Sequence, residues 1–431
     1  MTTRIVARSA DSVTIQIQIS LSGSCLLDSE ETIQTVLNEA GTLATGEALK
    51  QFDTDGGGAI QVGAEKWTSK GRQPKTYQTP YGAVEVERHV YQSSAGGTTR
   101  CPLEADGRVI ITSTPRFAKQ ISHKYAEMSS PRLVEDLQQN HGRSVHRSFV
   151  QTLAEAVGSI ALLREEDWHY QTPQLSTAIS TVSIGMDGTC LLLCEGGYRQ
   201  AMVGTISLYD AGGERQHTTY VAASPEYGRG TFLARLHREV EQVKRLYPTA
   251  HYQGLADGAA ENWTFLEPLT QTQVLDFYHA TQYLDKVAKA VHPRSVEAQK
   301  LWMKDQCQRL KHEAGAAARL LSEMEAILWP KRLSATLRDG LQDAITYFRN
   351  HHHQMHYAQA LARHLPIGSG VTEAGCKVII KARLCAAGMK WKERGAAIVL
   401  SLRTLSYSQG RWQQFWSKIT ECGFSLAELI H

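Results

Sequence analysis

Three carboxylates stand at positions where an α/β protein gathers reactive groups. Asp187 follows an apolar stretch that ends at Met186, and Asp257 follows another that ends at Ala256. Both aspartates precede a glycine, and open α/β sheets collect ligands at the ends of their strands. Glu373 opens an expected helix after a Gly-Ser-Gly break. A single aspartate here would be an ordinary turn residue, and a helix start favours a glutamate through the helix dipole. The repeated Asp-Gly setting is therefore the informative feature.

These carboxylates supply the donor atoms that metal-dependent phosphodiester cleavage needs. Mg²⁺ prefers oxygen ligands and keeps water and substrate oxygens in its shell. Two such ions, roughly 3.5–4 Å apart, can activate the attacking oxygen and stabilise the leaving one. Asp187, Asp257 and Glu373 lie far apart along the chain, so this chemistry requires a fold that brings the three together.

The segments around the two aspartates predict such a fold. Strands are expected over Thr181–Met186, Met202–Tyr209, Thr218–Ala223, Tyr252–Ala256 and Val274–Tyr278, with a helix over Phe232–Leu246. Three strands, a helix and further strands form the order of a ribonuclease-H-like domain, an α/β fold with a mixed sheet. Residues 179–280 are therefore interpreted as the first part of a catalytic core.

The chain after this core is predicted to be helical. Residues 281–365 are rich in Glu, Gln, Lys, Arg, Ala and Leu and lack strand patterns, which indicates an all-helical insertion. Residues 366–431 are expected to complete the core with a helix over Thr372–Leu384, which carries Glu373, and with basic C-terminal helices.

The N-terminal part is predicted to be a mixed and helical DNA-binding region. Residues 1–110 form a mixed α/β region with a β-hairpin around Pro80-Tyr81-Gly82. Residues 111–164 are helical, and a glycine turn at 140–143 gives them a helix-turn-helix-like pattern. His146, Arg147 and Gln151 lie off the apolar stripe of the following helix, and together with Arg143 of the turn they are expected to reach bases or phosphates. A plain helical hairpin is the alternative.

Charge and composition bound the class of protein. The net charge is only +3, but residues 377–403 hold seven Lys or Arg against one acid, Glu393. The exposed cations expected to bind DNA are Lys381, Arg383, Lys390, Lys392 and Arg394; a solvated helix face is the alternative. With no run of 18 apolar residues and no signal-peptide pattern at the start, we expect a cytoplasmic, nucleoid-associated protein without a membrane partner.

The chain resembles the DDE transposases of bacterial insertion sequences, in particular the ISKra group of the mutator-like branch. The resemblance covers most of the chain and rests on four blocks: Gly185–Gly188, Leu255–Gly258, Leu275–His279 and Ile367–Lys377. It implies a ribonuclease-H-like fold in which Asp187, Asp257 and Glu373 are the catalytic and metal-binding residues. The implied cofactor is a pair of Mg²⁺ ions, for which Mn²⁺ can substitute.

The resemblance also implies an activity and partners. Such enzymes bind the terminal inverted repeats of their element in double-stranded DNA, cleave at the element ends, and join the 3′ ends to target DNA. They usually work as homo-oligomers, because two ends must be held together. Two alternatives stay open: a ribonuclease-H-like nuclease without strand transfer, and an inactive DNA-binding repressor derived from a transposase.

The sequence also offers candidate residues that would assist the three carboxylates. Asp276 and His279 match the Asp-x-x-His motif of these enzymes, where the histidine contacts the scissile phosphate, orients a metal ligand, or merely caps a helix. Lys377 shares a helical face with Glu373, either to bind phosphate or as a surface ion pair. Trp302 resembles the tryptophan that stacks on a flipped base in related enzymes, although Trp329 is also available and either could be core. The histidines at 351–353 and 356 suggest a metal cluster, but consecutive helical residues point in different directions, so a solvated face is expected.

Overall fold

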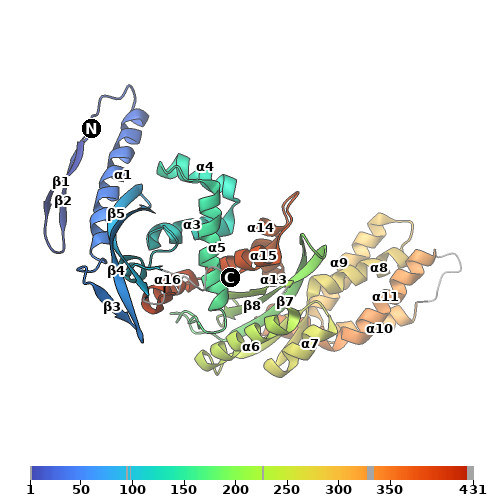
Figure 1. The fold of residues 1–431 in the computed structure, drawn as a ribbon. Helices are drawn as coiled ribbons and strands as arrows, with labels where there is room; N and C mark the ends of the chain where they lie inside the picture. The colour runs from blue at the N-terminus through green and yellow to red at the C-terminus, as the bar shows by residue number, and fades with distance from the viewer. Residues whose placement is uncertain (1, 94–95, 98, 226–227, 328–333, 425–431) are drawn as a thin grey trace. The chain divides into compact units, whose positions relative to one another are not determined.

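The computed structural model describes residues 2–93, 96–97, 99–225, 228–327 and 334–424. Their contacts divide the chain into two units (Figure 1). The first unit comprises residues 1–170 with 401–406 and 411–431, and the second comprises residues 171–400 with 407–410. The last helix, α16 (Arg411–Cys422), therefore belongs with the N-terminal unit, whereas the sequence grouped residues 366–431 with the core. None of the described helices combines the length and apolar character that a membrane crossing requires.

The second unit is built on a five-stranded mixed sheet, so the predicted α/β class is confirmed. Its strands are β7 (Thr181–Leu192), β8 (Tyr198–Tyr209), β9 (Arg215–Ala223), β10 (His251–Ala256) and β11 (Thr272–Leu275). The spatial order is β11-β10-β7-β8-β9. Strands β7, β8 and β9 run antiparallel, whereas β10 pairs in parallel with both β7 and β11. The first half of β7 is buried throughout, as expected of a central strand covered on both faces.

Helices cover the two faces of this sheet. Side chains alternate between faces along a strand, and β8 shows which helix lies on each. At Gly204, a Cβ atom would meet Phe232 and Leu236 of α6 (Gly228–Leu246). The neighbouring Val203 and Thr205 instead lie against Gly375 of α13 (Gly370–Gly375). Helix α13, which carries Glu373, therefore packs on the face opposite α6.

Two sequence-predicted boundaries near the carboxylates were wrong. The strand expected to end at Met186 continues to Leu192, because β8 stays in register with it down to the Leu192–Tyr198 pair. Asp187 thus lies within β7, opposite Val203, and not beyond its end. The strand expected over Val274–Tyr278 ends at Leu275, and α8 (Phe277–Val291) begins immediately afterwards. The Asp276 carboxylate accepts the backbone N–H of His279 as an N-cap, which favours a helix over a longer strand.

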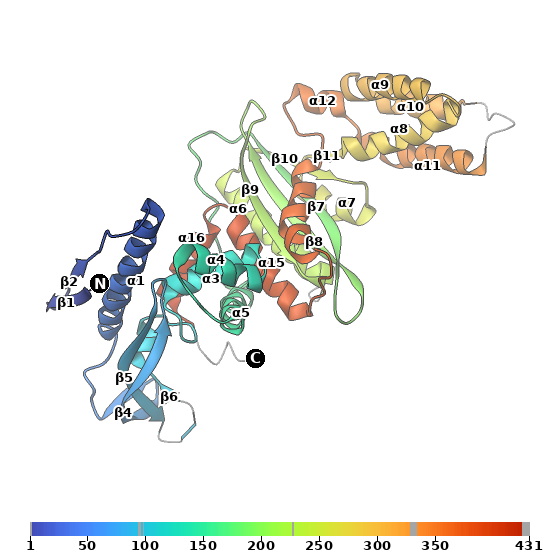
Figure 2. The same ribbon diagram turned by 90° about the horizontal axis from the view of Figure 1, so that it is seen from above.

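The region between β11 and α13 is helical, as predicted. Its main helices are α8, α9 (Val296–His312), α10 (Ala316–Glu325), α11 (Ala335–His351) and α12 (Tyr357–Ala362). Ser295 and Ser334 cap α9 and α11 by accepting backbone N–H groups. Figure 2 shows these helices gathered in a bundle, and their apolar faces extend the hydrophobic core of the sheet. After α13, the chain continues through the π-helical segment Cys376–Lys381 into α14 (Ala382–Leu384) and then α15 (Glu393–Tyr407).

The first unit combines small sheets with helices, as predicted. A hairpin of β1 (Thr2–Arg8) and β2 (Val13–Gln18) lies against α1 (Leu26–Lys50). A second sheet holds β3 (Ala59–Val62), β4 (Glu65–Gln78), β5 (Ala83–Ser93) and β6 (Thr99–Arg100). The predicted turn at Pro80-Tyr81-Gly82 joins β4 to β5. The short helix α2 (Pro102–Asp106) precedes α3 (Pro115–Glu127), α4 (Ser130–His141) and α5 (Arg147–Leu163). Gly142, in a left-handed conformation, ends α4.

Arg403 of α15 is a buried structural cation and does not belong to an exposed basic patch. Its guanidinium is 1% exposed and donates to the backbone oxygen of Ala126 and to the Glu127 carboxylate. We expect Arg403→Leu to lower the free energy of unfolding by about 1.5–3 kcal/mol, the usual cost of losing hydrogen bonds to a charged group. Urea unfolding followed by tryptophan fluorescence measures this. Arg394→Leu, on an exposed position of the same helix, is the control; equal stabilities for the two variants would contradict the assignment.

Candidate active site

Asp187 projects from the central strand toward the helix that carries Glu373. Residues directly opposite in an antiparallel pair share a face, so Asp187 lies on the same face as its partner Val203, which contacts α13. One carboxylate oxygen accepts the backbone N–H of Gly188 at 2.6 Å, and the other lies 3.6 Å from the thiol of Cys376. Burial raises the pKa of Asp187, and the negative charge of Asp257 raises it further.

Asp257 follows the end of β10 and is held from three directions. Its Oδ1 accepts the backbone N–H of Ala259 at 3.2 Å and the side-chain amide of Asn262 at 3.1 Å. Its backbone oxygen accepts the hydroxyl of Tyr347 at 3.1 Å. The next residue, Gly258, has a φ of +100°, a conformation open to glycine but strained for other residues. These contacts fix the carboxylate and leave its second oxygen, Oδ2, without a hydrogen-bond partner among the described residues.

Among the described residues, Asp276, His279 and Glu373 form a compact group of potential metal ligands. One ligand atom from each lies within 4.8 Å of the others. Asp276 is fully buried: one oxygen accepts the backbone N–H of His279 at 2.7 Å and lies 3.0 Å from its Nδ1, and the other accepts the backbone N–H of Ser369. The Ser369 hydroxyl donates to Glu373 at 2.9 Å. Asp276 and Ser369 thereby hold His279 and Glu373 side by side.

The predicted carboxylates and this group influence one another electrostatically. The hydrogen bond from Asp276 raises the pKa of His279, and the charges of Asp257 and Glu373 add to the rise. The charge of His279 in turn lowers the pKa of Asp187, against the larger effect of burial. Asp187 and Asp257 therefore lie near enough to His279 for their charges and its charge to interact. Within the described residues, however, the group of ligand atoms inside 4.8 Å includes only Glu373 from the predicted set of three.

Two of the predicted DNA-binding arginines are buried. Arg143 donates to the backbone oxygen of Thr79 and to the side chain of Gln78, and its guanidinium lies over the ring of Phe117. Arg383 is buried with its guanidinium 5.1 Å from the ring centre of Trp391. Both predictions were wrong, because tertiary packing uses these guanidinium groups inside the protein.

The other predicted contact residues have mixed positions. His146, Arg147 and Gln151 are exposed at the start of α5, and the amide of Gln151 donates to Glu155. The remaining predicted cations are exposed: Lys377, Lys381, Lys390, Lys392 and Arg394. Trp302 is half-buried and packs against the hydrophobic core, which favours the core alternative over a free stacking surface. Trp329 lies outside the described residues.

Helix α11 contributes Tyr347, which the sequence did not indicate, and His351, which the sequence placed on a solvated face. Tyr347, which holds the Asp257 backbone, stacks on Tyr283 of α8 with ring centres 3.7 Å apart. One turn later, the Nε2 of His351 lies 3.4 Å from where a Cβ atom of Gly258 would stand. Burial lowers the pKa of His351, against an opposing effect of the Asp257 charge. The expectation of a solvated histidine face was therefore wrong for His351. The i, i+4 spacing shows that Tyr347 and His351 share a face, but not that this face meets Asp257.

No protein-family model matches the chain, and a search of curated proteins returns no relative.

Asp276→Asn should lower the pKa of His279 toward its ordinary value of 6.5, because the substitution removes the charged hydrogen-bond partner that raises it. A pKa raised in the folded state adds stability below about pH 6.5, and this contribution is lost as the pH rises through the raised value. An NMR titration of the His279 ring in chelator measures the shift. Asp285→Asn, on a more exposed part of the same helix, is the control and should leave the titration unchanged. A His279 pKa that is equal in both variants would contradict this account.

Proposed function

We propose that the chain is a DNA transposase of the DDE class with a ribonuclease-H-like core. The observation that carries the proposal is the placement of Asp187 in β7 and of Asp257 directly after the adjacent strand β10, with the helix of Glu373 packed on the Asp187 face. If the strands are numbered by their order along the chain, they lie side by side in the sheet as third, second, first, fourth and fifth. Only the first three run antiparallel. This arrangement agrees with a ribonuclease-H-like domain. An all-helical insertion between the second and third carboxylates agrees with the resemblance to mutator-like transposases.

The donor set fits hard divalent ions. Asp187, Asp257 and Glu373 would hold two Mg²⁺ ions, and Mn²⁺ would be accepted because an imidazole such as His279 lies nearby. Burial raises the pKa of Asp187, with a smaller contribution from the charge of Asp257, and a bound cation would favour the ionised carboxylate. When bound, the metal pair supplies activation of the attacking oxygen and charge stabilisation at phosphorus.

The chain's own residues would prepare the site for that reaction. Asn262, Ala259 and Tyr347 orient Asp257, and Ser369 orients Glu373. His279, held through its Nδ1 by Asp276, can present Nε2 to a phosphate oxygen as a charged donor. The same site would first cleave the duplex at the element's terminal inverted repeat and then join the freed 3′ hydroxyl to target DNA. A homo-oligomer would hold two element ends together.

Asp257→Asn should abolish metal-dependent DNA cleavage while leaving the fold intact. Loss of groups behind a metal ligand typically costs roughly 10–100-fold, so loss of a ligand should cost more. The assay follows a labelled duplex that carries the element's own end with Mg²⁺, and Asp210→Asn in a loop is the matched control. Joined products would support transposition, and cutting without joining would favour a nuclease. Equal cutting by Asp257→Asn and the wild type would overturn the active site.

Tyr347→Phe tests the helical insertion as a support for Asp257. The variant keeps the stack on Tyr283 but removes the hydroxyl that donates to the Asp257 backbone. We expect weaker Mn²⁺ binding, by up to about tenfold, with little change in melting temperature. Calorimetric titration of the metal measures the affinity, and Tyr198→Phe, at a side chain that is 73% exposed, is the control. A lower melting temperature with unchanged Mn²⁺ affinity would show a purely structural role.

A further inference from the structure

A cationic hollow of about 540 Å³ lies in the first unit, far along the chain from the carboxylates. It is lined by α3, the end of α4, the β4–β5 turn, α1 and Trp412 of α16. Its charged lining consists of Arg116, Lys119 and Lys124, with His123 and His141 beside them. No carboxylate is among the described residues that line it.

One face of α3 supplies most of this charge. Arg116, Lys119, Gln120, His123 and Lys124 follow the spacing i, i+3, i+4, i+7 and i+8, which places them on a single face. The opposite face of α3 is buried and apolar, with Phe117, Ile121 and Tyr125 in the core. On the polar face, His123 packs edge-on against Trp412 and Gln120 lies 3.5 Å from the His141 ring nitrogen, whereas Arg116 is exposed.

Two of these cations lack an acidic partner. Lys124 pairs with Asp136 at 2.5 Å. Among the described residues, by contrast, neither Arg116 nor Lys119 has a carboxylate within 4.0 Å. Burial lowers the pKa of Lys119, and the nearby charge of Arg116 lowers it further. Like charges held together in a partly buried hollow cost free energy, which an anion bound there would offset.

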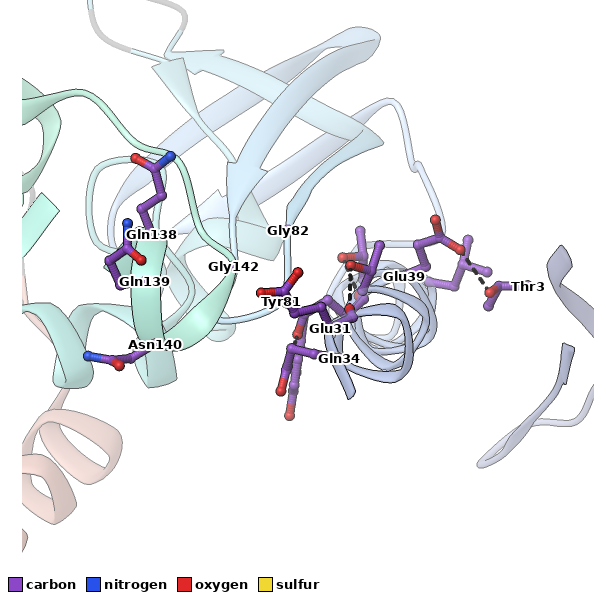
Figure 3. A pocket seen from close by; sticks show the side chains of 14 residues that line it. Thr3, Glu31, Gln34, Glu39, Tyr81, Gly82, Gln138, Gln139, Asn140 and Gly142 are labelled. Atoms are coloured by element: carbon purple, nitrogen blue, oxygen red, sulfur yellow. Dashed lines mark hydrogen bonds between the residues drawn. The ribbon is translucent and has the colours of Figure 1, made fainter. Parts of the chain in front are cut away.

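A second hollow, of about 820 Å³, joins the first and is rich in amides. The two share Gln34, Asn38, Tyr81 and Asn140. Figure 3 shows Gln138, Gln139 and Asn140 of α4 on one side of the second hollow and Gln34 of α1 on the other, with Tyr81 between them. Amide side chains both donate and accept hydrogen bonds, so they suit sugar and base edges. Glu31 and Glu39 also line this second hollow. Because their charges repel phosphates, a nucleic-acid backbone is directed toward the cationic hollow.

We propose that these joined hollows are a binding site for duplex DNA, with the phosphates of one strand at Arg116 and Lys119 and the amides of α4 beside the adjoining sugar and base edges. This site differs from the DNA contact that the sequence predicted for α5. That helix is buried from Ala156 to Ala161, and Arg143 is engaged inside the protein. Only the exposed start of α5 remains for DNA contact.

The test measures binding of the full chain to a labelled duplex by fluorescence anisotropy, in chelator and over a range of salt concentrations. Each lost phosphate contact lowers the slope of log affinity against log salt by about 0.9. The double variant R116A/K119A should therefore reduce this slope by about 2 and weaken binding to all sequences similarly. The control K70A/R132A removes two exposed charges outside both hollows, in the same unit, and should retain the wild-type slope.

The possible outcomes separate this site from its rivals. A slope that R116A/K119A leaves at the wild-type value, or that K70A/R132A lowers equally, overturns the proposal. Polyglutamate, measured in the same way, tests an acidic protein as the ligand. If R116A/K119A loses polyglutamate binding but keeps duplex binding, the hollow is assigned to an acidic protein and the proposal is overturned as well. Q138A/Q139A should keep the slope while changing the preference among duplex sequences. Because binding is measured without divalent metal, the result is independent of whether Asp187, Asp257 and Glu373 cleave DNA.

Discussion

The candidate site depends on one buried carboxylate, that of Asp276. Burial opposes its ionisation, but hydrogen bonds from His279 and Ser369 outweigh that effect and lower its pKa. Through these bonds it connects the end of β11, the first turn of α8 and the loop before α13. Removal of one donor would leave this buried charge less well compensated, which is costly. The positions of His279 and Glu373 therefore follow from the need to satisfy Asp276.

The same carboxylate closes the helical insertion. Asp276 stands where the chain enters the insertion, and Ser369 stands where the chain has left it. The backbone N–H of Phe277 also donates to Ile367 at 2.9 Å, and the Gln253 amide donates to Pro366. A long segment costs little more to close than a short one, so a bundle can be accommodated between two residues that stay in contact. Within the bundle, Tyr347 stacks on Tyr283 and its hydroxyl donates to the backbone oxygen of Asp257, so the bundle contacts the end of β10.

Local patterns were sufficient for the elements but not for the environments of the side chains. Apolar alternation and helix periodicity predicted the strands and helices around Asp187 and Asp257, and hence the α/β class. They placed Asp187 beyond its strand, because the length of β7 is set by its partner β8. They missed Tyr347, because its contact with Asp257 spans 90 residues. Whether a group such as Arg143 is exposed also depends on packing between distant segments, which single-sequence patterns do not contain.

The cations of this chain illustrate why a charge count is a poor guide to DNA binding. Of the basic residues that the sequence singled out, Arg143, Arg383 and Arg403 are buried and serve the protein's interior. A buried guanidinium that already donates to acceptors within the protein has few donors left for a phosphate. Neighbouring cations without a carboxylate partner gain more interaction energy when a phosphate binds. By that criterion, the proposed phosphate contacts fall on α3, where Arg116 and Lys119 lie close together. Its polar face is visible in the sequence only as residues left over from an apolar stripe.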